Sequence, residues 1–219
     1  VTLYAREYVA STGFSLSSSN ITIVRTEDNR QAELKAVIEP SNASDKRVTW
    51  SVTSGAEYID ITPDGDRVTL TAKGNGRAEV TATVYDQGIT QKTQTCTVKI
   101  VTPVRSLTTT QQSNMFVPVG GNVTLSATAS PDDALESSVT WYVDTTGTVD
   151  GYKQVKTETI TGGGTTTYDL KVESLPTLVK AEAVSNYDGT DYKAERVFTI
   201  IRRPAVSTRT PFAFLSDVY

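Results

Sequence analysis

Histidine is absent from the 219-residue sequence, and cysteine occurs only once. The chain therefore lacks the commonest general base, the usual partner of a serine nucleophile and the usual nitrogen ligand of zinc. The single cysteine, Cys96, excludes an internal disulfide, so folding must depend on packing alone. Alternation along its segment places Cys96 on the same face as Val98 and Ile100, which predicts a buried, inert thiol.

Long apolar runs and clusters of positive charge are also missing. No stretch approaches the roughly 20 consecutive apolar residues that a membrane-spanning helix needs, so we expect no membrane insertion. The net charge is −4, and lysine and arginine are spread along the chain instead of forming a basic segment. A phosphate backbone would find no basic surface here, so nucleic acid is not an expected partner.

The motifs of nucleotide binding and catalysis are absent as well. The segment 74–76 (Gly-Asn-Gly) lacks the third glycine and the following helix of a dinucleotide-binding motif, and no phosphate-binding loop ends in Gly-Lys-Ser or Gly-Lys-Thr. Neighbouring carboxylates, Asp132 with Asp133 and Asp64 with Asp66, could act as acid and base only in a cleft, and they lie in turn-like segments. We expect no enzymatic activity, no catalytic residues and no cofactor.

Calcium is the metal that the loop carboxylates would suit, because hard cations bind oxygen ligands. The best candidates are Asp188, Asp191 and the pair Asp132 and Asp133. Their spacing fits no calcium-binding loop, and aspartate is a common turn residue because its side chain bonds to nearby backbone. We therefore predict turn positions rather than a metal site.

What the sequence does contain favours strands. Threonine, serine and valine are abundant, and the β-branched residues among them suit a pleated, half-buried surface. A hydrophobic content of 37% is sufficient for compact cores. At 219 residues the chain is too long for one β-sandwich of about 100 residues and suits two.

An internal repeat is the most informative feature. The segment 34–52, LKAVIEPSNASDKRVTWSV, aligns without a gap with 125–143, LSATASPDDALESSVTWYV. Farther along, VTATVYDQG from Val80 resembles VKAEAVSNYDG from Val179, with a larger separation between the two copies. The second copy therefore carries extra residues, and these lie between 145 and 165.

Within each copy, apolar and polar residues alternate as in a sheet with one buried face. Both tryptophans share the inward parity of nearby valines, so we predict core packing for them rather than exposure as ligand-binding aromatics. The predicted core positions form two matched sets: Leu34, Val48 and Trp50 in the first copy, and Leu125, Val139 and Trp141 in the second. Turn residues at 63–66, 74–76 and 86–88 predict hairpins.

These patterns predict an all-β chain with two tandem sandwich domains and short terminal extensions. The expected parts are an N-terminal arm or remnant of a preceding domain (1–13), a first domain (14–102), a second domain (103–203) and an apolar C-terminal tail (204–219). The second domain is expected to contain an inserted hairpin near 150–164, which ends at the triple glycine 162–164.

Three blocks of the first copy carry a family resemblance. PSNASDKRVTWS at 40–51, TAKGNGRAEVTAT at 71–83 and TCTV at 95–98 resemble, in this order, the bacterial immunoglobulin-like group 2 domain over nearly all of 14–102. The second copy retains the proline-to-tryptophan block and lacks a counterpart of the Ala-Lys-Gly-Asn-Gly turn, so it resembles the family less closely. The resemblance implies two immunoglobulin-like β-sandwiches, a scaffold of surface and particle proteins that carries no chemistry of its own.

Any ligand must then be bound by loops or termini. The last residues group Phe212, Phe214, Leu215 and Tyr219, whereas a frayed tail would normally be polar. We expect these four residues to bind a protein partner, either a capsid or tail subunit or another surface protein. The alternative is that the tail folds back onto its own second domain.

The resemblance implies two functional classes. In the first, the chain is a non-enzymatic bacteriophage accessory protein on the virion surface, such as a capsid decoration, head fibre or tail-associated subunit, and it serves display or adhesion. In the second, it is a fragment of a bacterial cell-surface adhesin or stalk with extracellular spacer domains. A host surface glycan or protein is a further partner considered for both. Because no leader, membrane anchor or sorting signal is visible, the first class is our expectation.

Overall fold

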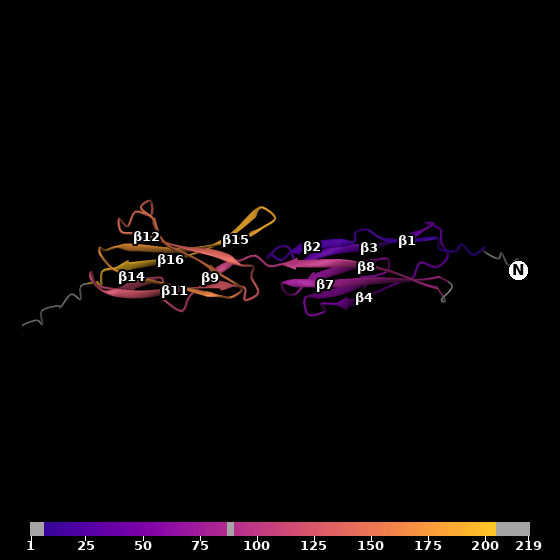
Figure 1. Ribbon diagram of the computed structural model, residues 1–219, viewed down its shortest axis with the longest axis horizontal. Helices are drawn as coiled ribbons and strands as arrows, with labels where there is room; N and C mark the ends of the chain where they lie inside the picture. Colours follow the sequence, from indigo (N-terminus) through magenta and orange to yellow (C-terminus); the bar gives the residue numbers. More distant parts are fainter. Residues whose placement is uncertain (1–6, 87–89, 205–219) are drawn as a thin grey trace, which may run out of the picture.

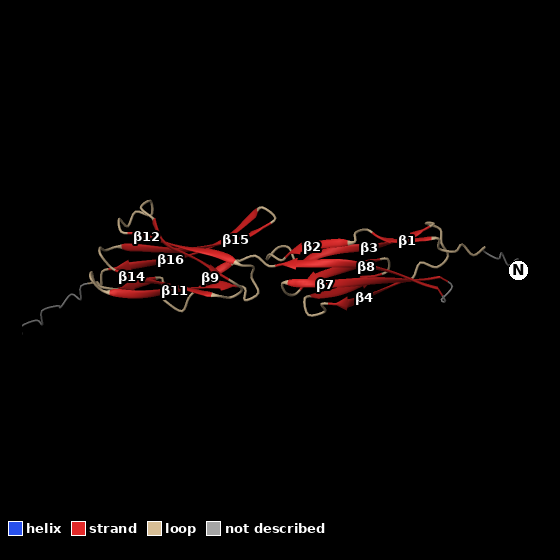
Figure 2. Ribbon diagram, in the orientation of Figure 1, coloured by secondary structure: helices blue, strands red, loops and turns tan. Residues whose placement is uncertain are grey.

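The computed structural model describes residues 7–86 and 90–204 and shows two β-sandwiches arranged end to end (Figure 1). This part of the chain is built from strands, turns and loops (Figure 2), and it contains no helix long and apolar enough to cross a membrane. The all-β prediction is confirmed. Within the described residues, sixteen strands form four sheets, two in each domain.

The first domain packs two four-stranded sheets face to face. One sheet has the order β1-β3-β6-β5, with bounds Gly13–Leu16, Gln31–Glu39, Arg67–Ala72 and Ile59–Asp64. The other has the order β2-β8-β7-β4, with bounds Asn20–Val24, Thr90–Val101, Gly76–Asp86 and Val48–Ser54. Neighbouring strands are antiparallel except for β2, which runs parallel to the end of β8.

The second domain divides its strands unequally between its sheets. The smaller sheet has the order β14-β11-β9, with bounds Thr165–Lys171, Asn122–Ser130 and Ser106–Thr108. The larger sheet has the order β10-β16-β15-β12-β13, with bounds Asn114–Phe116, Thr190–Ile201, Thr177–Tyr187, Ser137–Asp144 and Lys153–Ile160. Here β10 runs parallel to β16, as β2 does to β8.

Each domain has a hydrophobic core of its own. Leu34, Leu125, Val139 and Trp141 are fully buried, Trp50 is 9% exposed, and Val48 packs against the first core from a half-buried position. The two cores have no residue in common, so each sandwich buries its own apolar face.

The extra residues of the second copy change the strand arrangement. In the first domain, the strand that follows the tryptophan strand is β5, which pairs with β6. In the second domain, the corresponding strand β13 pairs instead with the tryptophan strand β12 and so belongs to the opposite sheet. The residues predicted as an inserted hairpin thus form an edge strand that widens one sheet to five strands.

One predicted hairpin is wrong. Residues 63–66 do turn back between β5 and β6, with Gly65 at φ +58°, and β7 pairs with β8 as predicted. However, β6 and β7 belong to different sheets, so the segment 73–75 crosses from one sheet to the other. A β-carbon on Gly76 would lie 2.7 Å from the ring of Tyr58, so close packing against that ring accounts for the glycine.

Candidate functional site at the domain junction

The linker between the two domains is buried. Val101, Thr102, Pro103 and Val104 are all buried, whereas flexible linkers are exposed and rich in glycine and serine. The second domain holds this linker through hydrogen bonds, one of which runs from the Thr102 hydroxyl to Asp133 Oδ2 at 3.4 Å. The Leu135 amide donates to the Thr102 carbonyl oxygen at 2.7 Å, and the Val104 amide donates to the Ser185 hydroxyl at 3.0 Å.

Arg25 reaches the linker because of the strand register. In the parallel pairing of β2 with β8, Val24 lies opposite Val101, and the Arg25 amide continues this ladder by donating to the Val101 carbonyl oxygen at 2.7 Å. The Arg25 residue is only 8% exposed, and its Nε donates to the Thr102 hydroxyl at 3.0 Å. A guanidinium is thereby buried beside the linker, where it requires an anionic partner.

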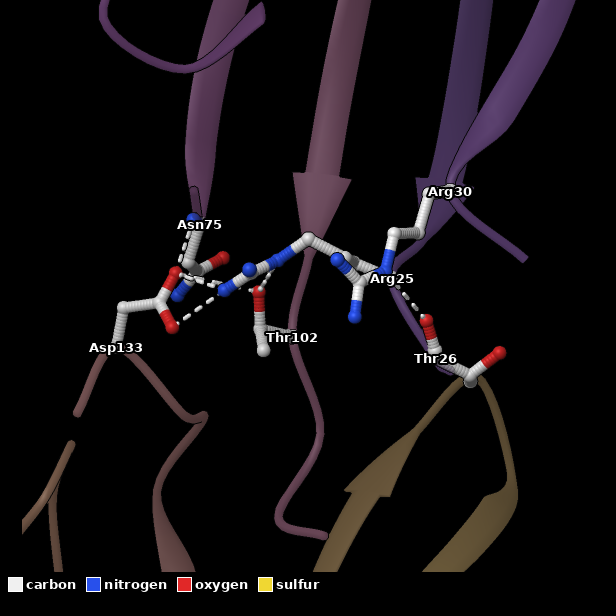
Figure 3. A network of polar contacts seen from close by, with 6 residues as sticks. All are labelled: Arg25, Thr26, Arg30, Asn75, Thr102 and Asp133. Atoms are coloured by element: carbon white, nitrogen blue, oxygen red, sulfur yellow. Dashed lines mark hydrogen bonds and ion pairs between the residues drawn. The ribbon is translucent and has the colours of Figure 1, made fainter. Parts of the chain in front are cut away.

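Asp133 of the second domain is that partner (Figure 3). It lies in the turn at 131–134, and its two carboxylate oxygens are each 2.5 Å from Nη2 of Arg25. The backbone amide of Asn75 also donates to Asp133 Oδ2, at 2.7 Å. One carboxylate therefore accepts hydrogen bonds from two separate segments of the first domain.

A second contact between the domains involves the β15–β16 hairpin. This hairpin extends toward the first domain (Figure 1), and the ring of Tyr187 lies 4.9 Å below the Lys99 ammonium group. An exposed cation–π contact contributes about 0.5–1 kcal/mol. In Figure 3 the hairpin and Asp133 lie on opposite sides of the linker. The linker and these two contacts give three attachment points, which together define one relative orientation of the domains.

The ion pair is the strongest of these polar contacts. The side chain of Arg25 is 10% exposed and that of Asp133 is 36% exposed, so the pair lies between the surface and the interior. Surface pairs contribute up to about 1 kcal/mol, and removal of one partner from a fully buried pair costs about 3–5 kcal/mol. We therefore expect about 2 kcal/mol for the loss of Asp133. Arginine, aspartate, asparagine and threonine in this arrangement include no activated nucleophile, so the cluster positions domains rather than reacting groups.

The carboxylates considered for calcium are not brought together. Asp188 has φ +51° and, with Gly189 at φ +75°, makes the tight turn of the β15–β16 hairpin. Asp191 accepts a hydrogen bond from the Asn186 side chain at 2.8 Å, while Asp133 binds Arg25 at the junction. Within residues 7–86 and 90–204, no group of three or more acidic or cysteine side chains could hold a metal ion.

The tail residues predicted to bind a partner, Phe212, Phe214, Leu215 and Tyr219, lie outside the described residues. Sequence reasoning missed Arg25 altogether. The available signal was its parity, since Ile21, Ile23 and Arg25 alternate on one face and Ile23 is buried in the core. A charged residue at the end of an inward-facing row predicts a buried ionic contact.

A family model matches the first domain of this chain. Residues 11–98 match the family described as bacterial Ig-like domain (group 2). An uncharacterized protein of Clostridium acetobutylicum is 31% identical over 140 residues, which cover 62% of this chain and 14% of the relative's length. The chain thus spans only a small part of that relative.

Several solved structures are similar at low sequence identity. A titin fragment of three immunoglobulin domains has 13% identity and a TM-score of 0.48, with 87% of this chain and 66% of the fragment covered. An ICAM-5 ectodomain fragment has 10% identity and a TM-score of 0.49, with 86% of this chain and 50% of the fragment covered. The adhesin InvE of Yersinia pseudotuberculosis has 18% identity and a TM-score of 0.33, with 86% of this chain and 58% of that chain covered. The family match at residues 11–98 is to the group that the three sequence blocks of the first copy resemble.

Proposed function

We propose that the chain is a non-enzymatic structural module whose two immunoglobulin-like domains form a stiff rod on the exterior of a virion or a cell. The observation that carries this proposal is the domain junction, where Arg25 of the first domain binds Asp133 of the second beside a buried linker. A rod of this kind holds its two ends at a constant separation, which suits display or spacing.

Bending at the junction would be costly for a physical reason. Arg25 is nearly buried, so a hinge motion that removes Asp133 would leave a guanidinium without its counter-ion in a desolvated position. The same motion would expose the buried linker and break the hydrogen bond from Leu135 to Thr102. Two domains without such contacts would be expected to move independently.

The setting that we propose first is a bacteriophage particle, on which the chain serves as a capsid decoration, head fibre or tail-associated subunit with capsid or tail proteins as partners. A bacterial surface stalk or adhesin is the second candidate. One observation favours the second candidate: the bacterial relative matches this chain over only 14% of its length. Such a proportion is expected where immunoglobulin-like domains are units within a much longer surface protein.

The stiffness of the rod can be tested by measuring the distance between two spin labels. Labels attached at the exposed positions Thr53 and Lys153 report on the two domains, while Cys96 is buried and should remain unlabelled. We expect a narrow distance distribution in the unmodified junction and a broad one after Asp133→Ala. The matched control is Asp132→Ala, which removes the same charge from the neighbouring exposed residue and should leave the distribution narrow.

A broad distribution without any junction substitution, or an equally narrow one after Asp133→Ala, would contradict the stiff-rod proposal. The setting needs a separate measurement. Antibodies against the second domain, detected by electron microscopy on particles and on cells, should label an exterior surface. Detection of the chain only inside cells would contradict the proposed location, whatever the stiffness of the rod.

A further inference from the structure

The far end of the second domain carries an apolar hollow of about 720 Å³. Its volume lies within the range of about 300–1,000 Å³ that is typical of ligand-binding sites. Two of its residues are unusually exposed for their type, Phe116 at 54% and Val119 at 60%. The complete lining, named here the terminal hollow, consists of Phe116, Val117, Pro118, Val119, Leu175, Arg202 and Arg203.

The internal repeat shows what this surface corresponds to in the first domain. Val117 directly follows β10, which runs parallel to β16, and Arg25 directly follows β2, which runs parallel to β8. Leu175 lies in the connection from β14 to β15, and Asn75 lies in the corresponding connection from β6 to β7. The terminal hollow is therefore the counterpart of the face through which the first domain contacts the second.

A third segment that lines the terminal hollow also has a counterpart at the junction face of the first domain. Arg202 follows β16 as Thr102 follows β8, so both faces lie where the chain leaves a domain. In the first domain, the residues that follow cover this face: the turn that contains Asp133 lies against it. In the second domain the counterpart is more apolar and carries two exposed arginines. A segment that offers large apolar side chains and a carboxylate would complement it.

We propose that the segment 205–219 of the same chain docks in the terminal hollow. This segment follows directly after Arg203, which lines the hollow, and Pro204. Phe212, Phe214 and Leu215 supply large apolar side chains for a surface lined by Phe116 and Val119. Asp217 supplies a carboxylate that can pair with an exposed arginine of the rim.

The length of the segment favours docking within one chain. Phe212 follows Arg203 by about nine residues, and a flexible segment of that length has a mean span of roughly 17 Å. Short tethers of this kind give effective concentrations of about 1 mM. If the free segment bound with a dissociation constant of about 0.1 mM, the tethered one would be docked in roughly ten chains for every open one. A modest affinity thus suffices for cis docking.

The first test uses methyl and aromatic NMR signals of the full chain. Ser substitutions of Phe212 and Phe214 should shift the signals of Val117, Val119 and Leu175, because the docked rings would no longer lie against these side chains. The matched control replaces Thr208 and Thr210 by Ser in the same segment and should leave these signals unchanged. Unchanged hollow signals in the phenylalanine variant would overturn the proposal.

The second test approaches docking from the hollow. Val119→Lys should increase the rate of tryptic cleavage after Arg209 at least about fivefold, because an undocked segment enters the protease more readily. Val155→Lys is the control, since Val155 is an exposed valine on the edge strand β13 and its replacement should leave the rate unchanged. Equal cleavage rates in all three proteins would refute docking in the hollow.

Dilution distinguishes docking in one chain from exchange between chains. Cis docking gives the same cleavage rate and NMR signals from about 10 to 500 μM, because the effective concentration is set by the tether. Signals that change with protein concentration would show that a second copy supplies the segment, and would overturn the cis proposal. The stiff-rod measurement with Asp133→Ala does not depend on either result.

Discussion

Replacement of Trp141 by alanine is the most direct test of the claim that the two sandwiches have separate cores. Trp141 is fully buried, and its ring stacks against Tyr168 and Phe198 with centroid separations of 5.9 and 6.1 Å. Its indole Nε1 donates to the Thr166 hydroxyl at 2.8 Å. The residue is therefore anchored by two aromatic contacts and by one hydrogen bond.

The expected loss of unfolding free energy follows from these contacts. Truncation of a buried tryptophan to alanine costs about 3–5 kcal/mol. We expect the upper end, about 5 kcal/mol, because two aromatic contacts of about 0.5–1.5 kcal/mol each and one buried hydrogen bond of about 1 kcal/mol disappear together. Trp141→Phe retains an aromatic ring near Tyr168 and Phe198 and loses only the donor and part of the buried area, so it should cost about 2 kcal/mol.

The sequence makes the assay selective, because Trp50 and Trp141 are its only tryptophans. In Trp141→Ala, tryptophan fluorescence reports on the first domain alone, while far-UV circular dichroism reports on both domains. During denaturant titration, the destabilised second domain should unfold at a lower denaturant concentration than the first domain. Circular dichroism should show this transition, and the fluorescence of Trp50 should not change during it. In Trp50→Ala the assignments reverse, and fluorescence then reports on the second domain.

Because the domains are in contact at the junction, we expect the unfolding of the second domain to destabilise the first domain slightly. When the second domain unfolds, Asp133 leaves Arg25, so the first domain should lose about 2 kcal/mol of the stabilisation that the ion pair provides. In Trp141→Ala, the unfolding transition of the first domain, followed by Trp50 fluorescence, should thus shift to lower denaturant concentration. This shift should be less than half of the shift in the transition of the second domain, followed by circular dichroism. If the fluorescence transition shifts together with circular dichroism, the two domains unfold as one unit and the inference of separate cores is wrong.

Three further predictions concern chemistry and solution conditions. Burial raises the pKa of the Cys96 thiol, so Ellman's reagent should modify Cys96 only in unfolded protein; fast labelling of the native chain would contradict its buried position. Hydrogen bonds from the Thr166 and Thr146 hydroxyls are the largest causes that lower the pKa values of Glu158 and Asp144, respectively. The two ionised carboxylates therefore stabilise the folded second domain at pH values above their unfolded pKa values of about 4. This stabilisation is lost as the pH falls through the lower pKa values of the folded state, so the second domain should become less stable below about pH 4. An acid transition confined to the first domain would contradict this assignment. A chelator should leave the melting temperature unchanged, and a decrease that calcium reverses would contradict the reading of the loop aspartates as turn residues.

Much of the fold could be predicted because alternation and burial are local properties of the sequence. Leu34 and Leu125 occupy matched, fully buried positions, as their inward parity indicates. The hairpin turn at Asp188 could also be read from the sequence, because aspartate followed by glycine tolerates two successive left-handed residues. In each case a few neighbouring residues determine the result.

The sheet to which a strand belongs is harder to predict. β5 and β13 both follow a tryptophan strand and both alternate, yet β5 pairs with β6 and β13 pairs with β12. The choice depends on the longer connection before β13, in which Asp144 accepts hydrogen bonds from the Thr146 and Val149 amides. Because either edge could accept such a strand, alternation alone could not identify its neighbour.

The partner of Arg25 could not be predicted, because Arg25 and Asp133 are 108 positions apart and belong to different domains. Asp133 occupies the place that Asn42 has in the first copy, and both lie in turns closed by an alanine amide. The two turns even hold the incoming chain alike: the Ser44 amide donates to the Val9 carbonyl oxygen, and the Leu135 amide donates to that of Thr102. The fold therefore specifies where the incoming chain lies, and the carboxylate of Asp133 determines that this turn also binds Arg25 of the domain before it.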